Sequence, residues 1–420
     1  MRSSGLHLSP FRGLRYAARR VNSLAAVLSP PYDVVVRPDG VAHLETADPH
    51  NIVRLILPHA PDPATRHHQA ADTLCRWQRE GVLERDEAPT LYVYEQRHGE
   101  VLQRGLIGAL RLDGPVLPHE DVVPEIVADR ADLMREAAAQ FEPLLLAYDG
   151  AGDDASGDAS AVIERTVEEA APLFAATTED GWSHRLWAVT DPEELAAVDA
   201  GLRRQEALIA DGHHRWATYL RLREERPGRA DWERGLVLLV DSARYPLRVR
   251  AIHRVLPRLP LDSAVAASEG LFRCRTVDGS LPDALAALER TTGNAFLLSG
   301  GRGSFRLLDR PDPALLERAV RTDRPAGWRR LDATVLHSVL LDAVWQVPDR
   351  PSDISYLHSA EAAVDKAHEH GGTAVLLRAV REETVRELAD QGVMMPRKST
   401  SFGPKPASGV VLRLLGDEPA

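Results

Sequence analysis

The stretch ALIADGHHRWATYL, residues 207–220, places an apolar run, a glycine and a helical pattern directly after one another. The run ALIA predicts a buried strand, and the residues after the polar interruption have helical spacing. Gly212 lies between the two elements and permits a sharp turn or a close backbone approach. A strand–turn–helix unit of this kind is typical of proteins that combine helices with sheets.

Polar residues fill the turn itself: Asp211, His213, His214 and Arg215. Asp211 is predicted to cap the helix, whose first backbone N–H groups favour an anion. Arg215 offers a fork that can hold phosphate at two points, and both histidines can donate hydrogen bonds near neutral pH. The turn therefore predicts an anion site that includes Gly212, with His214 also a candidate catalytic residue. The alternative is a capped helix whose first turn is polar by coincidence.

A metal site at the turn is a weaker interpretation. Adjacent histidines point in different directions and rarely bind one ion together, and zinc requires three or four protein ligands. Asp211 with one histidine can still hold Mg²⁺ beside nucleotide phosphates.

The remainder of the chain predicts an α/β or α+β fold with mixed sheets and no fixed-period repeat. We expect three regions, 1–150, 151–257 and 258–420. The individual expectations are a buried strand at 51–58, a helix at 64–81, a hairpin from 90–97 and 105–112, and an acidic loop at 149–160.

Composition excludes several classes of protein. The 420 residues are 44% hydrophobic and 27% charged, with a net charge of -11 that argues against a nucleic-acid partner. Because the chain has no long apolar run and no apolar signal core, we expect a cytoplasmic protein without a membrane partner. Cys75 and Cys274 are expected to be buried thiols. The common phosphate-loop, dinucleotide, zinc-protease and serine-hydrolase motifs are absent.

Two other segments carry candidate functional groups. In LPHEDV, 117–122, His119 and Glu120 follow a proline, and Glu120 can act as a general base, or as a metal ligand if paired with Asp211. The alternative is an exposed loop acid. The segment MPRKSTSFGPKPASG, 395–409, predicts an ordered loop with phosphate ligands or else a solvated surface loop. Its candidate ligands are Lys398, Ser399, Thr400 and Lys405.

Rigid segments near the N-terminus offer groups that can orient a substrate. SPPYDVV, 29–35, contains Tyr32 and Asp33, and FRGLRY, 11–16, contains Arg12. An interpretation as ordinary surface polarity is equally open for them.

These motifs, together with NIVRLILP, YVYEQ, LIGALRL, LWAVTDP and AIHRVL, resemble the bacterial and archaeal family called domain of unknown function 1015. The resemblance extends from residue 10 to about 410. A remoter resemblance, carried by the HE pair and the strand–DGHHR–helix unit, is to the ParB/sulfiredoxin-like fold, which includes free serine kinases.

The remoter resemblance implies a function. It assigns the phosphates of ATP or ADP to the turn Asp211–Arg215, and the roles of base and partner of the base to Glu120 and His119. Mg²⁺ is the implied metal. We therefore expect a phosphotransferase acting on a small hydroxyl-bearing metabolite. The alternatives are a metal-dependent hydrolase or phosphatase, a nucleotide-binding regulatory protein of ParB type, and a non-catalytic fold that binds another anion.

Overall fold

The computed structural model describes residues 5–35, 38–150, 159–301 and 303–416. The chain divides into two compact units. Unit 1 comprises residues 1–117, 122–247 and 404–420, and unit 2 comprises 118–121 and 248–403. Most of the acidic loop expected at 149–160 lies outside the described residues.

Unit 1 is built on a mixed sheet in which nine strands are described, in the order β6-β11-β8-β12-β5-β4-β10-β9 with β1 beside β5. β11 runs parallel to β6 and antiparallel to β8, and β8 runs parallel to β12. The strands are β1 (Leu8–Ser9), β4 (Leu91–His98), β5 (Val101–Arg111), β6 (Val116–Leu117), β8 (Leu144–Tyr148), β9 (Phe174–Thr177), β10 (Ser183–Val189), β11 (Ala207–Asp211) and β12 (Arg234–Asp241). The predicted hairpin is confirmed as β4 and β5.

Two small sheets complete the strands of unit 1. They pair β2 (Leu14–Tyr16) with β3 (Leu83–Arg85), and β7 (Ala139–Gln140) with β21 (Arg413–Leu414). β21 pairs with β7, and Leu412 and Leu415 beside it are buried in the hydrophobic core of unit 1.

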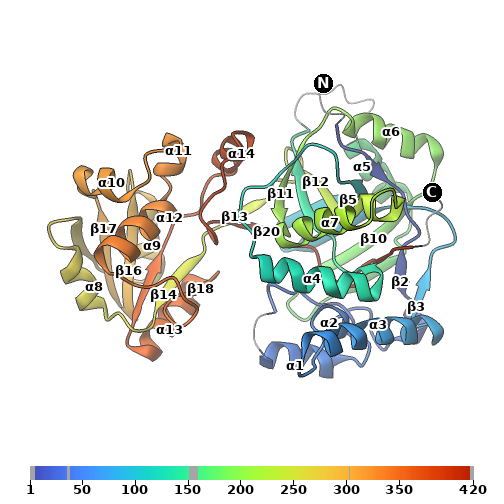
Figure 1. The fold of residues 1–420 in the computed structure, drawn as a ribbon, viewed down its shortest axis with the longest axis horizontal. Coiled ribbons are helices and arrows are strands. Elements are labelled where there is room, and N and C mark those ends of the chain that lie inside the picture. Colours follow the sequence, from blue (N-terminus) through green and yellow to red (C-terminus); the bar gives the residue numbers. More distant parts are fainter. Residues whose placement is uncertain (1–4, 36–37, 151–158, 302, 417–420) are drawn as a thin grey trace. The chain divides into compact units, whose positions relative to one another are not determined.

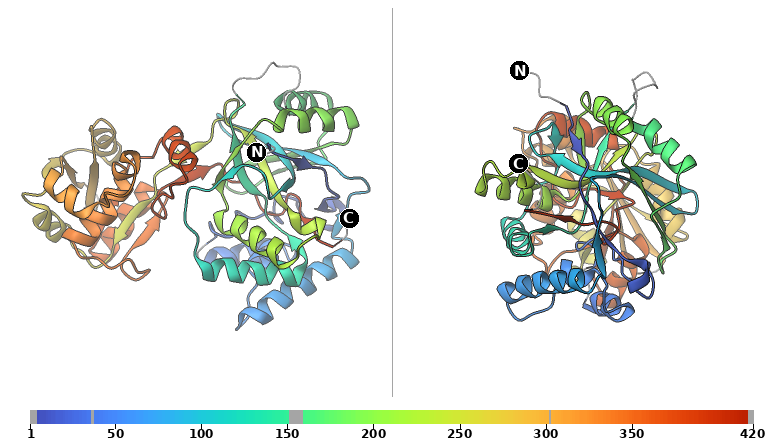
Figure 2. Two further views of the ribbon diagram at one scale, coloured as in Figure 1. Left: turned by 45° about the horizontal axis from the view of Figure 1, so that its top comes forward. Right: turned by 90° about the vertical axis from the view of Figure 1, so that its right-hand side faces the viewer.

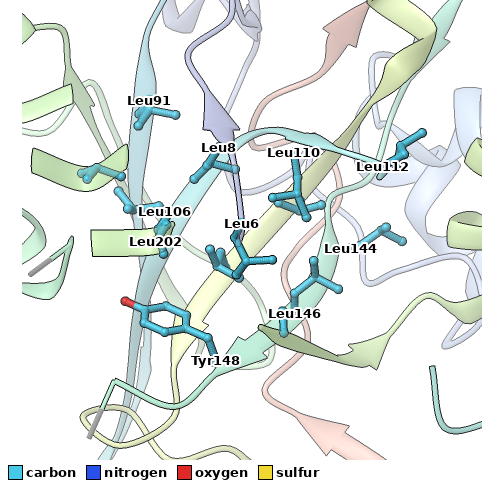
Figure 3. Close-up of a cluster of buried hydrophobic side chains, with 14 of the residues drawn as sticks. Leu6, Leu8, Leu91, Leu106, Leu110, Leu112, Leu144, Leu146, Tyr148 and Leu202 are labelled. Atoms are coloured by element: carbon cyan, nitrogen blue, oxygen red, sulfur yellow. The ribbon is translucent and has the colours of Figure 1, made fainter. Parts of the chain in front are cut away.

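The helices of unit 1 pack against this framework (Figures 1 and 2). They are α1 (Pro38–Ala47), α2 (Val53–Ile56), α3 (Pro63–Arg79), α4 (Pro124–Ala137), α5 (Ala159–Glu169), α6 (Pro192–Leu202), α7 (His213–Glu225) and the 3₁₀ turns η1 (Ala18–Arg20) and η2 (Ala230–Glu233). α3 packs on α4, α4 packs on α7, and α5 packs on α6. Figure 3 shows the leucine-rich core between these layers, where Leu6, Leu110 and Leu144 are fully buried.

Unit 2 has a six-stranded sheet, in the order β15-β17-β16-β19-β14-β18, and a separate pair β13-β20. Its strands are β13 (Arg248–Arg250), β14 (His253–Leu256), β15 (Arg273–Val277), β16 (Ala295–Gly301), β17 (Ser304–Asp309), β18 (Ser355–Leu357), β19 (Thr373–Leu376) and β20 (Ser401–Gly403). Its helices are α8 (Leu261–Ser268), α9 (Leu281–Glu289), α10 (Pro313–Ala319), α11 (Ala326–Arg329), α12 (Asp332–Val335), the π-helix η3 (Leu336–Val344), α13 (Ala360–His370) and α14 (Glu382–Asp390). α13 covers β14, β16 and β19.

The α/β prediction with mixed sheets is confirmed, and the domain organisation differs from the three regions expected. Strands on both sides of residue 150 share one sheet, because β8 pairs with both β11 and β12. The chain leaves unit 1 after residue 247 and returns to it at residue 404. Unit 1 is therefore discontinuous in sequence.

The strand expected at 51–58 is wrong, because this segment forms the short helix α2. Asn51 fixes the start of the helix: its amide donates to the carbonyls of Ala26 and Leu28, and its oxygen accepts the N–H of Val53 at 2.9 Å. Val53, Leu55 and Ile56, which suggested a strand, are fully buried on this helix instead. A short apolar run has the same composition in either element.

The expected burial of both thiols is also wrong. Cys75 is exposed on α3 and Cys274 is half-buried on β15. The neighbours Leu74 and Trp77 occupy the buried face of α3, so Cys75 lies on its solvent side. Among the described residues, no helix is both long and apolar enough to cross a bilayer.

Candidate functional site

The turn between β11 and α7 depends on Gly212. Its φ of 100° and ψ of 29° place it in the left-handed region, and it is the N-cap of α7. A Cβ at this position would lie 2.4 Å from Leu144 Cδ2 and 3.1 Å from Arg215 Nη2. Both the backbone angle and the surrounding space therefore require glycine here.

Asp211 does not cap α7, which corrects the prediction from sequence. Within the described ranges this helix has no side-chain cap, and Asp211 is the last residue of β11. One carboxylate oxygen, Oδ1, lies 2.5 Å from Lys405 Nζ, and the other, Oδ2, lies 2.7 Å from Arg215 Nη2. The strand direction turns the carboxylate toward these two cations, and the first N–H groups of α7 are left to other acceptors.

Lys405 joins Asp211 to Asp33, and Asp33 precedes Lys405 by 372 positions in the chain. Its ammonium donates to Asp33 Oδ2 at 2.7 Å. Burial by itself lowers the pKa of Lys405, but the charges of Asp211 and Asp33 outweigh it and raise the pKa above its ordinary value. Lys405 is therefore a charged, largely buried ammonium between two carboxylates.

Arg215 is a buried structural cation and does not project from the first turn. Its side chain is 4% exposed, and Nη1 donates to the carbonyl of Pro143 at 3.1 Å. Burial lowers the pKa of Arg215, but Glu142 and Asp211 more than compensate and raise it. Its guanidinium lies 5.8 Å from the centroid of the Tyr32 ring.

Tyr32 and Glu142 form the layer behind this cluster. Glu142 Oε1 accepts the backbone N–H of Tyr32 at 3.0 Å and the hydroxyl of Ser408 at 2.9 Å. The guanidinium carbon of Arg130 lies 4.8 Å from the centroid of the Tyr32 ring. Burial raises the pKa of Tyr32 to about 12, so this phenol is neutral at physiological pH.

The two histidines of the turn are half-buried at the start of α7. His214 Nε2 accepts the backbone N–H of Val123 at 3.0 Å, which assigns the ring proton to Nδ1. This bond links α7 to the residue before α4. His213 occupies the first position of α7, where an anion would meet the backbone N–H groups.

The segment that carries Lys405 is held by a chain of buried hydrogen bonds, called here the Tyr94–His184 relay. The carbonyl of Pro404 accepts from Gln96 at 3.1 Å, and the N–H of Ala407 donates to the Tyr94 hydroxyl at 3.2 Å. Since the Tyr94 oxygen already accepts from Ala407, its own proton is directed to His184 Nδ1 at 2.8 Å. Burial lowers the pKa of His184 to about 4, which keeps the ring neutral and able to accept.

This relay predicts a pH dependence of stability. Between pH 6.5 and 4 the unfolded chain binds a proton at His184 more readily than the folded chain does. The contribution of His184 is therefore complete above pH 6.5 and is lost as the pH falls. The wild type should lose unfolding free energy between pH 7 and pH 5. In His184→Gln this loss should be smaller by about 2 kcal/mol. Urea unfolding at both pH values measures it, and an unchanged difference between them would exclude His184.

His119 and Glu120 belong to unit 2, where the segment 395–400 packs around them. The carbonyl of His119 accepts the N–H of Met395 at 2.8 Å. Glu120 Oε1 accepts the backbone N–H of Lys398 at 3.2 Å, and Lys398 has a left-handed φ of 58°. A non-glycine residue in this region is uncommon and occurs often at functional positions.

The two hydroxyl-bearing residues of this loop are also bonded within unit 2. His119 Nε2 is 3.0 Å from Thr400 Oγ1, and Ser399 donates to the carbonyl of Pro396. Both hydroxyls are largely buried, so they hold the loop in place around Glu120.

Arg254 is a buried cation of unit 2 that the sequence did not suggest. It is 1% exposed, and burial lowers its pKa to about 10. Its Nη2 lies 3.0 Å from His337 Nε2, and its guanidinium lies 5.0 Å from the centroid of the Tyr356 ring. His337 belongs to the π-helix η3, an element often found at functional sites. Nothing in the pattern around Arg254 distinguishes it from a surface arginine.

The structure thus brings together Tyr32, Asp33, Asp211, Arg215 and Lys405 in unit 1. It groups the remaining loop candidates with Glu120 in unit 2. Arg12 joins neither group: its Nε donates to the carbonyl of Asp86 at 2.9 Å. Glu142 and Ser408 were missed, although Glu142 is a single acid directly before the apolar run PLLLAY.

Comparison with known families finds one family that matches most of the chain. The model of the family described as "Protein of unknown function (DUF1015)" matches residues 8–334, and the chain belongs to this family. A search of curated proteins found no match.

Three solved structures are similar to the chain at low scores. A free serine kinase in complex with AMP is 18% identical, with 71% of this chain and 87% of that chain covered and a TM-score of 0.36. A conserved hypothetical protein from Pyrococcus furiosus is 16% identical, with 73% and 93% covered and a TM-score of 0.37. C-terminally truncated SbnI from Staphylococcus aureus is 9% identical, with 71% and 82% covered and a TM-score of 0.35.

Proposed function

We propose that this protein is a nucleotide-dependent phosphotransferase that acts on a small hydroxyl-bearing metabolite, in the manner of a free serine kinase. The proposal includes a ParB/sulfiredoxin-like core around β11 and α7. One observation carries it: in the described part of the chain the start of α7 has no side-chain cap, and the ammonium of Lys405 lies beside it on Asp211.

The charges at this turn suit an anionic ligand. Asp211 precedes the helix directly, but Lys405 and Arg215 contact its two oxygens and neutralise it. The carboxylate therefore does not repel a phosphate at the N-terminus of α7, where backbone N–H groups and the helix dipole favour negative charge. In this proposal, phosphates of ATP or ADP bind Gly212, His213 and the N–H groups of the first turn.

Asp211 does not fit the role of a magnesium ligand in this arrangement. Mg²⁺ binds oxygen at about 2.0–2.1 Å, and each oxygen of Asp211 already has a cationic partner. Among the described residues, no group of three or more histidine, cysteine, aspartate or glutamate side chains is placed to hold a metal. The metal-dependent hydrolase is therefore the weaker alternative, and the proposed chemistry relies on side-chain cations and helix N–H groups.

The base that accepts the substrate proton is Glu120 in this proposal, by resemblance to the serine kinases. Its carboxylate accepts the backbone N–H of Lys398, and it lies close enough to the buried Arg254 to interact with the charge of that guanidinium. An ionised carboxylate with a fixed orientation is suited to accept a proton from a hydroxyl. His119 serves by holding Thr400 and thereby the loop.

Nucleotide binding is the first test. We expect ATP, ADP or inorganic phosphate to raise the thermal unfolding temperature of the whole chain, since a ligand that binds the folded state stabilises it. If none of the three does so, the proposal fails. Phosphorus NMR then tests whether phosphate is transferred from ATP or ADP to a small hydroxy-amino acid. If nucleotide binds and no transfer is seen, a regulatory protein is favoured instead.

Glu120→Gln tests the base. We expect unchanged nucleotide affinity and a loss of turnover of at least about 100-fold, because an amide cannot accept the proton. Glu125→Gln, an exposed acid in the first turn of α4, is the matched control and should retain full turnover. Equal turnover in the wild type and Glu120→Gln would remove Glu120 from this role.

A further inference from the structure

We infer that Lys405 is the resident cation of this site: its ammonium takes the position that a divalent metal would occupy between Asp33 and Asp211. It follows that unit 1 binds phosphate without a protein-bound metal. The second part rests on the proposed function, whereas the first part does not.

Distances support the first part. Lys405 Nζ lies 2.5 Å from Asp211 Oδ1 and 2.7 Å from Asp33 Oδ2. Calcium binds carboxylate oxygens at about 2.3–2.6 Å, so the nitrogen sits close to where such an ion would lie. A metal and this ammonium cannot occupy the same position, and the second oxygen of Asp211 is bonded to Arg215.

Burial and charge support it as well. The side chains of Asp211 and Lys405 are 8% and 17% exposed, and that of Asp33 is 29% exposed, so the Asp211 carboxylate above all would be costly to leave unneutralised in this place. Lys405 and Arg215 supply two positive charges against the two negative charges of Asp33 and Asp211. Glu142 is a third carboxylate, which acts on Arg215 from behind the cluster. The two carboxylates that flank Lys405 each have a cationic partner within the protein.

The chemistry of the ammonium connects this cation to the ligand. An ammonium group has three hydrogens, and two of them are directed to the carboxylates. Within the described part of the chain, Lys405 has these two carboxylates as its hydrogen-bond and ion-pair partners. The third hydrogen is the donor that we assign to an anionic ligand at the start of α7.

Manganese binding tests the position of the cation, with no activity required. The signal of free Mn²⁺ in electron paramagnetic resonance reports how much ion the full-length protein binds. We expect the wild type to have no Mn²⁺ site that depends on Asp211, so Asp211→Asn should leave its Mn²⁺ binding unchanged. Lys405→Ala should gain a site, with affinity at least about tenfold tighter than any wild-type binding. Lys398→Ala is the matched control, since it removes an exposed lysine of unit 2, and it should gain no site.

A second variant confirms the ligands and covers a failure to fold. The double variant Lys405→Ala with Asp33→Asn keeps only one carboxylate and should lose the new Mn²⁺ site. If Lys405→Ala is unfolded in metal-free buffer, we expect Mn²⁺ to restore its fold. A wild-type site that depends on Asp211, or a Lys405→Ala variant that neither binds Mn²⁺ nor folds with it, would overturn the inference.

Phosphate binding tests the second part on the unmodified protein. We expect inorganic phosphate to bind the wild type equally well in EDTA and in Mg²⁺ by titration calorimetry. Binding that disappears in EDTA would overturn metal independence. No phosphate binding in either buffer, together with a gained Mn²⁺ site in Lys405→Ala, would remove the proposed function and leave the resident cation standing.

Discussion

Arg215→Leu is expected to lower the free energy of unfolding by about 3–5 kcal/mol, because it removes a buried cation and leaves Asp211 with Lys405 as its remaining partner. Arg215 bonds to Asp211 and presents little of its charge to solvent, since its side chain is 4% exposed. The charge of Arg215 also interacts with the carboxylate of Glu142. The expected result is thus a folding defect, and any loss of nucleotide binding follows from it. Urea unfolding followed by circular dichroism measures the change.

Arg221→Leu on the same helix provides the control. Arg221 pairs with Glu225 four residues later, and its side chain is 44% exposed. An exposed pair of this kind contributes little, so the free energy of unfolding should change by about 0.5 kcal/mol or less. If both variants lost the same stability, or if Arg215→Leu lost less than about 1 kcal/mol, the structural role of Arg215 would be excluded.

Gly212→Ala is expected to affect both stability and ligand binding. An alanine with a left-handed φ costs about 1–2 kcal/mol, and its Cβ would also press against Leu144 at 2.4 Å. Overpacking of a core adds about 1–3 kcal/mol, so we expect a total loss of several kcal/mol in unfolding free energy. Relaxation of this clash moves the start of α7, and phosphate affinity should fall with it.

A second variant separates the effect of the clash from the effect of the backbone strain. Gly228→Ala is a control for the left-handed φ alone, because Gly228 has a φ of 77° and a Cβ added there would meet no atom within 4 Å. It should lose about 1–2 kcal/mol and keep its phosphate affinity. An equal loss of stability in both variants would show that Leu144 is not a constraint.

The local pattern of the sequence was sufficient to predict β11, Gly212 and α7, because each depends on neighbouring residues. It was misleading where a distant partner decides the outcome. Asn51 holds a helix start through carbonyls more than twenty positions earlier, so the apolar run after it forms α2. Asp211 was expected to cap α7, but cations from α7 itself and from the segment after residue 403 turn its carboxylate away.

The candidate site shows the same division. The residue types of the turn and of the 395–409 segment were identified from sequence, but their partners were not. Lys405 and Asp33 are 372 positions apart, and no local pattern relates them. Glu142 and Arg254 became candidates only through burial and contacts, which a single sequence does not give. The assignment of Glu120 as the base remains a prediction.

The discontinuity of unit 1 has a consequence for the order of events during synthesis. Unit 2 is nearly continuous, whereas unit 1 requires residues from 404 onward: Lys405 at the ion cluster, Ser408 on Glu142 and β21 on β7. A nascent chain on the ribosome therefore holds Asp33 and Asp211 without their ammonium until this last segment emerges. Unit 2, translated in between, can fold before the first half of unit 1 has its final partners. The ion cluster closes late, as the step that completes unit 1.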